Sequence, residues 1–229
     1  MNASSAVSVT AIVLAGGQSS RMGRDKALIS VNGVPLIRQV CEVAQACASK
    51  VYVVTPWSER YQDILPSRCS LVREVPFQKH EPEKMNEELI HPNLGEREVP
   101  ASFIPHPSHG PLIGFAQGLA PVQTEWVLLL ACDLPNLKEE ILLNWVQHLP
   151  EVPEDCIAFL PRHPKGWEPL CGFYRRRCLP SLTEFINKGG RSFQQWLSQH
   201  PVQELPLTER SLLFNCNTPA DLEELKMQN

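Results

Sequence analysis

The sequence has 229 residues, enough for one domain with a modest second lobe, and its 21 Lys and Arg against 25 Asp and Glu give a net charge of -4. With 20% charged and 43% apolar residues, this composition excludes a disordered chain and a strongly basic nucleic-acid-binding protein. The eight cysteines form no C-x-x-C pair, so we expect reduced thiols that pack as small core residues. No apolar run reaches the roughly 20 residues that span a bilayer, and the first residues lack the pattern of a signal peptide. We therefore expect a cytoplasmic protein that binds neither nucleic acid nor membrane.

The first third of the chain predicts a strand, a loop, a helix and a second strand. Residues 7–14 are short, β-branched and almost wholly apolar, which is typical of a strand buried on both faces. From Pro35 to Cys47 apolar residues recur at helical spacing, and residues 51–55 form the next strand. Such a unit normally belongs to a parallel sheet with right-handed crossovers.

Residues 74–98 interrupt this pattern. They are polar, contain prolines and show no sustained apolar periodicity, so we interpret residues 74–102 as an exposed insertion or a mobile loop. Residues 74–98 include seven acidic and three basic residues, so the whole net charge of -4 arises in this segment.

Regular structure returns with a short helix predicted over Pro111–Leu119 and a central apolar strand over residues 126–132. Asp133 follows that strand directly, at the edge where open α/β sheets bind ligands. Asn136 and Glu139 have the spacing of a capping box for the next helix.

The last third predicts strands at residues 156–160 and 170–174 and a helix at 178–186. Ser192 is expected to cap a further helix, and Thr218 to cap a final one that begins with residues 217–221. We find no internal repeat, so one continuous sheet is favoured over two independent domains.

The loop of residues 14–26 (LAGGQSSRMGRDK) carries the most chemical information. Adjacent glycines after a buried strand let backbone amides approach an anion, and Arg21 and Lys26 add positive charge. The glycine pair alone would also fit a tight surface turn. Neither G-x-G-x-x-G nor a Gly-Lys-Ser/Thr sequence occurs, which disfavours a hydride-transfer enzyme and a Walker-type NTPase.

Residues 14–17 (LAGG), 20–23 (SRMG) and 25–28 (DKAL) closely resemble the N-terminal signature of the molybdenum cofactor guanylyltransferases. The resemblance continues, in family order, in residues 110–114, 131–135, 168–174 and 215–222, and it covers the chain apart from the insertion.

This resemblance implies an α/β fold, a Rossmann-like three-layer αβα arrangement with a mostly parallel central sheet, as in nucleotide-diphospho-sugar transferases. It implies a single nucleotidyltransferase domain over residues 1–229. Residues 6–73 and 103–150 would bind the nucleotide, and residues 151–229 would form the acceptor, or pterin, side.

The implied reaction transfers GMP from GTP to the phosphate of molybdenum-molybdopterin, with Mg²⁺, to give the guanine dinucleotide cofactor and pyrophosphate. GTP and molybdenum-molybdopterin are thus the expected partners, and molybdenum-insertion proteins and molybdoenzyme chaperones are further candidates. Related cytidylyltransferases usually read LAAG, and sugar-phosphate enzymes G-x-G-T-R-L, so the LAGG and SRM sequences favour guanylyl transfer. The alternatives are a cytidylyl- or sugar-phosphate nucleotidyltransferase, or a non-catalytic molybdopterin- or nucleotide-binding chaperone. Intact Arg21, Lys26 and Asp133 argue against a purely binding role.

The chemistry of such a transfer explains the residue types. A phosphate acceptor is already an anion, so the enzyme needs no nucleophile of its own and must align two polyanions and neutralise the leaving pyrophosphate. We expect Arg21, Lys26 and Asp133 to be catalytic, with Asp133 as the Mg²⁺ ligand; the alternative role of Asp133 is to cap the following helix. The predicted nucleotide-binding residues are Leu14, Ala15, Gly16, Gly17, Ser20, Arg21, Lys26 and Asp133.

Other positions leave two interpretations open. Arg191 is either a ligand of the pterin phosphate or a solvated loop arginine, and Asn217 and Thr218 either face the pterin or only cap the last helix. His109 and residues 162–165 (RHPK) either face the acceptor or are surface charge.

The family commonly carries a carboxylate that contacts guanosine several positions before the GPL block. This chain has residues 103–107 (FIPHP) there. Either the insertion has displaced the carboxylate, with Glu98 and Glu74 as candidates, or base recognition differs.

Overall fold

The computed structural model describes residues 7–16, 25–75, 110–207, 209–216, 220–221 and 223. Their main feature is a seven-stranded sheet in the order β11-β7-β10-β6-β1-β4-β5. Strand β10 is antiparallel to both of its neighbours, and all other pairings are parallel. The strands are β1 (Val9–Leu14), β4 (Lys50–Thr55), β5 (Cys69–Arg73), β6 (Trp126–Ala131), β7 (Ala158–Leu160), β10 (Cys171–Arg175) and β11 (Val202–Glu204).

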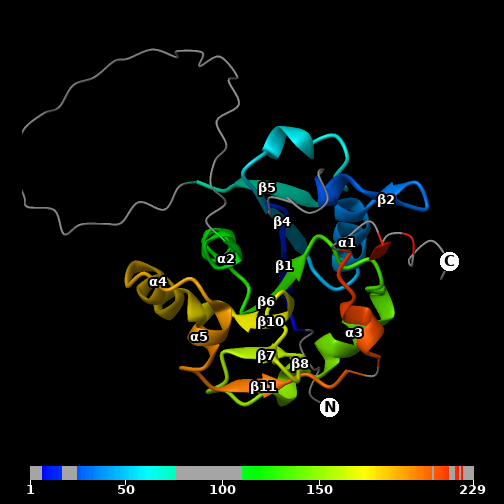
Figure 1. Ribbon diagram of the computed structural model, residues 1–229. Helices are drawn as coiled ribbons and strands as arrows, with labels where there is room; N and C mark the ends of the chain where they lie inside the picture. Colours follow the sequence, from blue (N-terminus) through cyan, green and yellow to red (C-terminus); the bar gives the residue numbers. More distant parts are fainter. Residues whose placement is uncertain are drawn as a thin grey trace, which may run out of the picture.

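Helices cover both faces of this sheet, so the molecule has three layers (Figure 1). On one face lie α1 (Leu36–Gln45) and α3 (Glu139–Gln147); on the other lie α2 (Pro111–Leu119), α4 (Leu179–Asn187) and α5 (Phe193–Leu197). The predicted α/β fold with a mostly parallel central sheet and αβα layers is therefore confirmed.

The central strands are apolar along their whole length because both of their faces are covered. In β1, Ile12 packs into the core beneath α2, whereas Ala11 and Val13 pack beneath α1. The same alternation in β6 sends Leu128 and Leu129 to opposite cores, and all five side chains are inaccessible to water. Such strands read as continuous apolar runs, which is why the sequence predicted them well.

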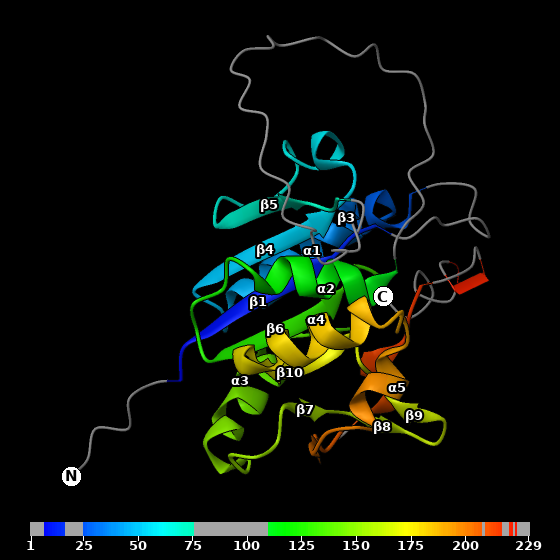
Figure 2. The ribbon, with the colours of Figure 1, turned by 90° about the vertical axis from the view of Figure 1, so that its left-hand side faces the viewer.

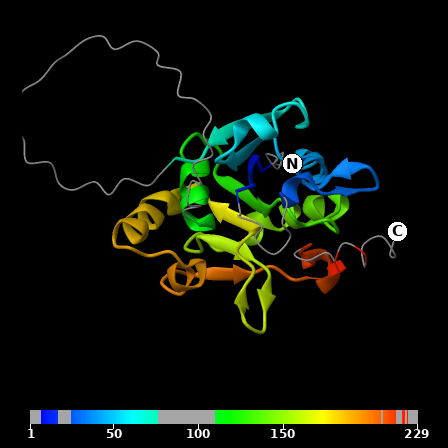
Figure 3. The same ribbon diagram turned by 45° about the horizontal axis from the view of Figure 1, so that its top comes forward.

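Shorter elements surround the sheet (Figures 2 and 3). Two hairpins stand away from it, formed by β2 (Ser30–Val31) with β3 (Val34–Pro35) and by β8 (Arg162–His163) with β9 (Gly166–Trp167). The first turns through Asn32 and Gly33 at φ of 52° and 81°, the conformation for which Asn-Gly is preferred in two-residue hairpin loops. The 3-10 helices are η1 (Lys26–Leu28), η2 (Ser58–Arg60), η3 (Leu149–Glu151), η4 (Arg176–Cys178) and η5 (Arg210–Leu213).

Most predicted elements occur within a few residues of their expected bounds. The helix over Pro111–Leu119 and the Ser192 cap, which accepts a hydrogen bond from Gln195 N, are confirmed. Strand β5 was not predicted. Residues 76–102 of the predicted insertion, and Thr218 with its proposed cap, lie outside the described residues.

The predicted capping box of Asn136 and Glu139 is wrong. Helix α3 begins at Glu139, and its N-cap Lys138 makes no side-chain capping bond. Asn136 instead donates to Ser211 O at 3.0 Å and ties the loop after β6 to the C-terminal segment. The Asn136 side chain thus makes a hydrogen bond to a residue far away in the sequence, in place of the local capping bond that the spacing predicted.

The described helices include none that is both long and apolar enough to cross a bilayer.

The contact between α2 and the sheet gives a test of the packing. A β-carbon on Gly118 would lie 2.8 Å from Val54 Cγ2 and 2.9 Å from Ile12 Cγ2, whereas one on Gly114 would meet only ordinary contacts of 3.6 Å and beyond. We expect Gly118→Ala to lower the free energy of unfolding by about 1–3 kcal/mol, because the buried β-branched neighbours must move.

Gly114→Ala, one turn away on the same helix, is the control. It should be neutral or stabilising by up to about 1 kcal/mol, because alanine favours the helix. Urea unfolding measures both variants, and equal stabilities would show that Gly118 is not needed for this close approach.

Candidate functional site

The site lies at the carboxyl ends of the two central strands. Strand β1 is followed in the chain by β4 on one side, while β6 returns to its other side, so the strand order reverses between β1 and β6. Leu14 pairs with Ala131 at the end of both strands, and Cys132 N donates to Leu14 O at 3.2 Å. In open α/β sheets a crevice forms at such a reversal, because the loops leave in opposite directions.

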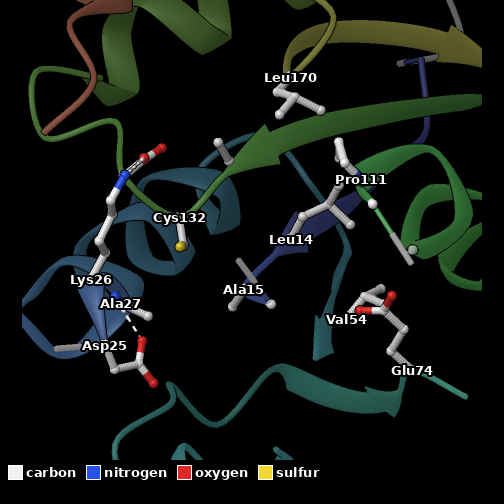
Figure 4. A pocket seen from close by; sticks show the side chains of 15 residues that line it. Leu14, Ala15, Asp25, Lys26, Ala27, Val54, Glu74, Pro111, Cys132 and Leu170 are labelled. Carbon is white, nitrogen blue, oxygen red and sulfur yellow. Dashed lines mark hydrogen bonds and ion pairs between the residues drawn. The ribbon is translucent and has the colours of Figure 1, made fainter. Parts of the chain in front are cut away.

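A cavity of about 250 Å³ opens at this point (Figure 4). Its walls come from the ends of β1, β4, β5 and β6, from η1 and from the start of α2. The residues that line it are Leu14, Ala15, Gly16, Asp25, Lys26, Ala27, Val54, Glu74, Gly110, Pro111, Gly114, Ala131, Cys132, Asp133 and Leu170.

An ion pair lies at one side of the cavity. Lys26 Nζ is 3.6 Å from Asp133 Oδ2, and the two side chains are only 20% and 17% exposed. Asp133 does not cap α3, since that cap is Lys138. The cation and the carboxylate predicted to act together are therefore neighbours, although 106 residues lie between them in the chain.

The surroundings tune the groups beside this pair. Burial raises the pKa of Asp133 above its ordinary value, and the ammonium of Lys26 only partly offsets this effect. Burial, with the nearby carboxylates Asp133 and Asp25, also raises the pKa of the Cys132 thiol. That thiol is neutral at physiological pH and is no nucleophile.

Glu74 lies at the opposite side of the cavity from Lys26 (Figure 4). It directly follows β5; its N donates to Thr55 O at 2.8 Å, and Gln117 of α2 bonds both the N and the O of Val75. The space that a β-carbon on Gly16 would need is occupied by Pro56 Cδ at 2.9 Å and Glu74 Oε2 at 3.0 Å. Glycine at this position therefore lets the carboxylate approach the end of β1.

A second cavity, of about 260 Å³, adjoins the first. The two share Ala131, Asp133 and Leu170 in their walls. Its other lining residues come from the loop after β6, from the start of β10 and the loop before it, and from the C-terminal segment. They are Leu134, Glu168, Pro169, Cys171, Leu213 and Asn215. Asp133 thus lies between two cavities, one lined by Gly16 and Lys26 and one lined by residues of the C-terminal segment.

Of the residues predicted to bind nucleotide, the fold brings five together at the first cavity: Leu14, Ala15, Gly16, Lys26 and Asp133. Gly17, Ser20 and Arg21 lie outside the described residues, as do Glu98, His109, Asn217 and Thr218.

Two weaker candidates lie elsewhere. Arg191 lines neither of these cavities, and its Nη1 donates to Ile186 O and Gly190 O at the end of α4. Residues 162–165 form the exposed end of the β8–β9 hairpin, where Arg162 stacks on Trp167 at 5.1 Å from the ring centroid.

Sequence reasoning missed Asp25 and Leu170 as lining residues and left Glu74 as one of two candidates for a displaced carboxylate. Glu74 became recognisable only with β5, whose short sequence CSLVR gives a weak strand signal beside the long polar segment. Its position after a parallel strand that ends at the same edge as β1 is the signal that could have found it.

A metal ion at this site would rest on few protein ligands. Within the described residues no group of three His, Cys, Asp or Glu side chains is arranged to hold a metal. Asp133 is a hard oxygen donor in the wall of both cavities, which fits Mg²⁺, since this ion commonly uses one or two carboxylates together with substrate phosphates and water.

Comparison with known proteins agrees with this architecture. Residues 11–203 match the MobA-like NTP transferase domain. The chain belongs to this family. Its relatives include a probable molybdenum cofactor guanylyltransferase of Trichormus variabilis, 56% identical over 93% of this chain and 88% of that protein.

Another relative of this MobA-like NTP transferase, from Synechococcus elongatus, has the same description and is 38% identical over 95% of this chain and 97% of that protein. Among solved structures, molybdopterin-guanine dinucleotide biosynthesis protein A of Archaeoglobus fulgidus superposes with a TM-score of 0.68. It is 20% identical, covers 96% of this chain and 97% of its own, and so supports the fold.

The raised pKa of Asp133 gives the NTP transferase a measurable pH dependence. A carboxyl whose pKa is higher in the folded than in the unfolded state disfavours folding once it is ionised, and this cost disappears as the pH falls through the folded-state pKa towards the unfolded one. In EDTA at pH 7, we expect Asp133→Asn to raise Tm by about 1–4 °C, because the variant removes the cost of ionising a poorly solvated carboxyl.

The gain should shrink as the pH falls towards the ordinary range of a carboxyl near 4. Asp63→Asn, at an exposed carboxylate, is the control and should leave Tm unchanged. A lower Tm for Asp133→Asn at pH 7 would show that attraction to Lys26 outweighs the cost of burial.

Proposed function

We propose that this protein transfers GMP from GTP to the terminal phosphate of molybdenum-loaded molybdopterin, releasing pyrophosphate. Membership in the NTP transferase family supports nucleotidyl transfer, and relatives described as molybdenum cofactor guanylyltransferases support this donor and this acceptor. The observation that carries the proposal is the place of Asp133, which lies in the wall common to two adjoining cavities. Transfer between two polyanions needs such a point, with the donor on one side and the acceptor on the other.

The side chains at this point suit a reaction in which the substrate supplies the nucleophile. A phosphate oxygen of the acceptor attacks the α-phosphorus of GTP, the bond from that phosphorus to the bridging oxygen breaks, and pyrophosphate leaves. Cys132, the thiol among the described residues that line the first cavity, keeps its proton, and no covalent intermediate is required. Lys26 offers a cation for the triphosphate, and in doing so it separates from Asp133.

Asp133 is then the residue that would hold Mg²⁺. When bound there, the ion would supply positive charge against the phosphates as negative charge gathers on the leaving group. Before nucleotide binds, Lys26 supplies the counter-charge that lowers the cost of ionising the largely buried Asp133 carboxylate. The same carboxylate therefore has a cationic partner both with and without substrate.

Glu74 supports selection of guanine. A carboxylate only accepts hydrogen bonds, and guanine is the base whose Watson–Crick edge presents two adjacent N–H donors. Cytosine presents an acceptor at the corresponding ring nitrogen, which would face the carboxylate unfavourably. Glu74 is the described carboxylate at the far side of the cavity from the Lys26–Asp133 pair, where the base would lie if the phosphates bind Lys26. We therefore assign to Glu74 the role for which Glu98 was the other candidate.

The test is pyrophosphate release by the purified protein with Mg²⁺ and molybdenum-loaded molybdopterin. Wild-type protein should turn over GTP with a kcat/KM at least about a hundredfold above that for CTP, since a site built to bond a donor rejects ligands that lack it. Glu74→Gln should reduce this preference at least about tenfold, because an amide can donate to cytosine. Glu154→Gln, the same change at an exposed glutamate, should leave the preference unchanged.

Three results would contradict the proposal in different ways. Equal turnover of CTP and GTP by the wild type would point to another nucleotidyltransferase. Binding of both substrates without pyrophosphate release would indicate a non-catalytic chaperone. An unchanged preference in Glu74→Gln would remove the role of Glu74 and leave the reaction itself in place.

A further inference from the structure

The carboxylate of Asp25, next to Lys26, is occupied by neighbours on both of its oxygens. Oδ1 accepts a hydrogen bond from Ala27 N at 3.1 Å and so caps η1, the turn that carries Lys26. Oδ2 accepts one from the hydroxyl of Tyr61 at 2.7 Å. Asp25 lines the first cavity, yet both oxygens of its side chain bond neighbouring residues of the protein.

Tyr61 is held rigidly at the other end of this contact. Its side chain is inaccessible to water and packs in the same core as Ala27. Its backbone N donates to Ser58 O, and its O accepts from Ile64 N and Leu65 N, so the backbone on both sides of it is fixed. Burial, followed by the contact with Asp25, raises the pKa of Tyr61, so the hydroxyl stays protonated and donates a hydrogen bond to Asp25.

The third partner of Asp25 contributes less. Arg60 Nη1 lies 3.5 Å from Oδ2 and is 37% exposed, and its guanidinium stacks on Trp57 at 4.3 Å from the ring centroid. Long exposed ion pairs of this kind stabilise little. The short bond from the buried hydroxyl is therefore the contact that fixes the direction of Asp25.

These contacts form a chain that ends at the Lys26 ammonium. The Tyr61 hydroxyl orients Asp25, Asp25 caps η1, and the capped turn presents Lys26 at 3.6 Å from Asp133. We propose that Tyr61 is a positioning residue for nucleotide binding, which acts through Asp25 to hold Lys26 where the triphosphate binds. The proposal rests on the proposed function, since it assigns to Lys26 a phosphate ligand.

An experiment can distinguish this positioning role of the Tyr61 hydroxyl from a purely structural role in the fold. A buried phenylalanine would fill the same core space, so Tyr61→Phe removes only the hydroxyl and its bond to Asp25. If the hydroxyl acts by positioning Lys26, its removal matters only while Lys26 is present. If it acts on the fold in general, its removal matters equally with and without Lys26.

The experiment is a double-mutant cycle on the dissociation constant of GTP with Mg²⁺, measured by isothermal titration calorimetry without acceptor. We expect Tyr61→Phe to weaken GTP binding about tenfold and Lys26→Ala about a hundredfold. The double variant should bind within about twofold of Lys26→Ala alone. Tyr174→Phe is the matched control: it removes a buried hydroxyl that donates to Pro169 O at 2.8 Å, and should leave GTP binding unchanged.

Asp25→Asn is a second variant that keeps the shape of the side chain and should weaken binding in the same direction, so the test does not depend on one protein folding. Wild-type affinity in both Tyr61→Phe and Asp25→Asn would overturn the positioning role. A Tyr61→Phe effect that multiplies with that of Lys26→Ala would also overturn it. Wild-type affinity in Lys26→Ala would instead contradict the part of the proposed function that gives Lys26 a phosphate ligand.

Discussion

The parallel pairing of β1 with β6 is the constraint on which the rest of the site depends. Because Leu14 pairs with Ala131, the two chains leave the sheet at the same level, and the segments after the two strands must share one crevice. Gly16 and Lys26 follow β1 in the chain, and Asp133 follows β6. A shift of one residue in this register would turn the side chains of one strand to the opposite face of the sheet and would separate Lys26 from Asp133. Strand register thus brings the two segments to one crevice, and the capped turn η1 then presents Lys26 to Asp133.

Holding that pair has a cost that other parts of the fold offset. Asp133 is disfavoured as an anion by its burial, and Lys26 lies beside it as its described counter-ion. Large apolar cores on both faces of the sheet, one beneath α1 and α3 and one beneath α2, α4 and α5, supply the stability. Under the proposed function, a carboxylate that is poorly solvated in the free protein would exchange Lys26 for a metal ion at little further cost of desolvation. Functional sites are often less stable than they could be for this kind of reason.

The sequence predicted those parts of the molecule in which the residue types themselves indicate burial or a local hydrogen bond. β1 and β6 are apolar runs because they are buried on both sides, and Asp133 stands out because a charge comes directly after such a run. Lys26 was recognised from its loop, and Ser192 from a cap whose bond is local.

Features that depend on distant partners were missed or misjudged. Asn136 has the spacing of a local cap but bonds Ser211, which is 75 positions away, and Tyr61 reaches Asp25 across 36 positions. β5 is short and only partly buried, so its strand character was weak, and with it the place of Glu74 at the cavity remained open. In each case the deciding contact is tertiary, and no pattern of neighbouring residues encodes it.

The proposed role of Asp133 is to join a nucleotide to Mg²⁺ at the edge between β1 and β6. Its most direct test is the affinity of GTP measured by calorimetry with and without Mg²⁺, in the wild type and in Asp133→Asn. We predict that Mg²⁺ tightens GTP binding at least about tenfold in the wild type and less than about twofold in Asp133→Asn. An enhancement by Mg²⁺ that remains complete in Asp133→Asn would contradict this role of Asp133.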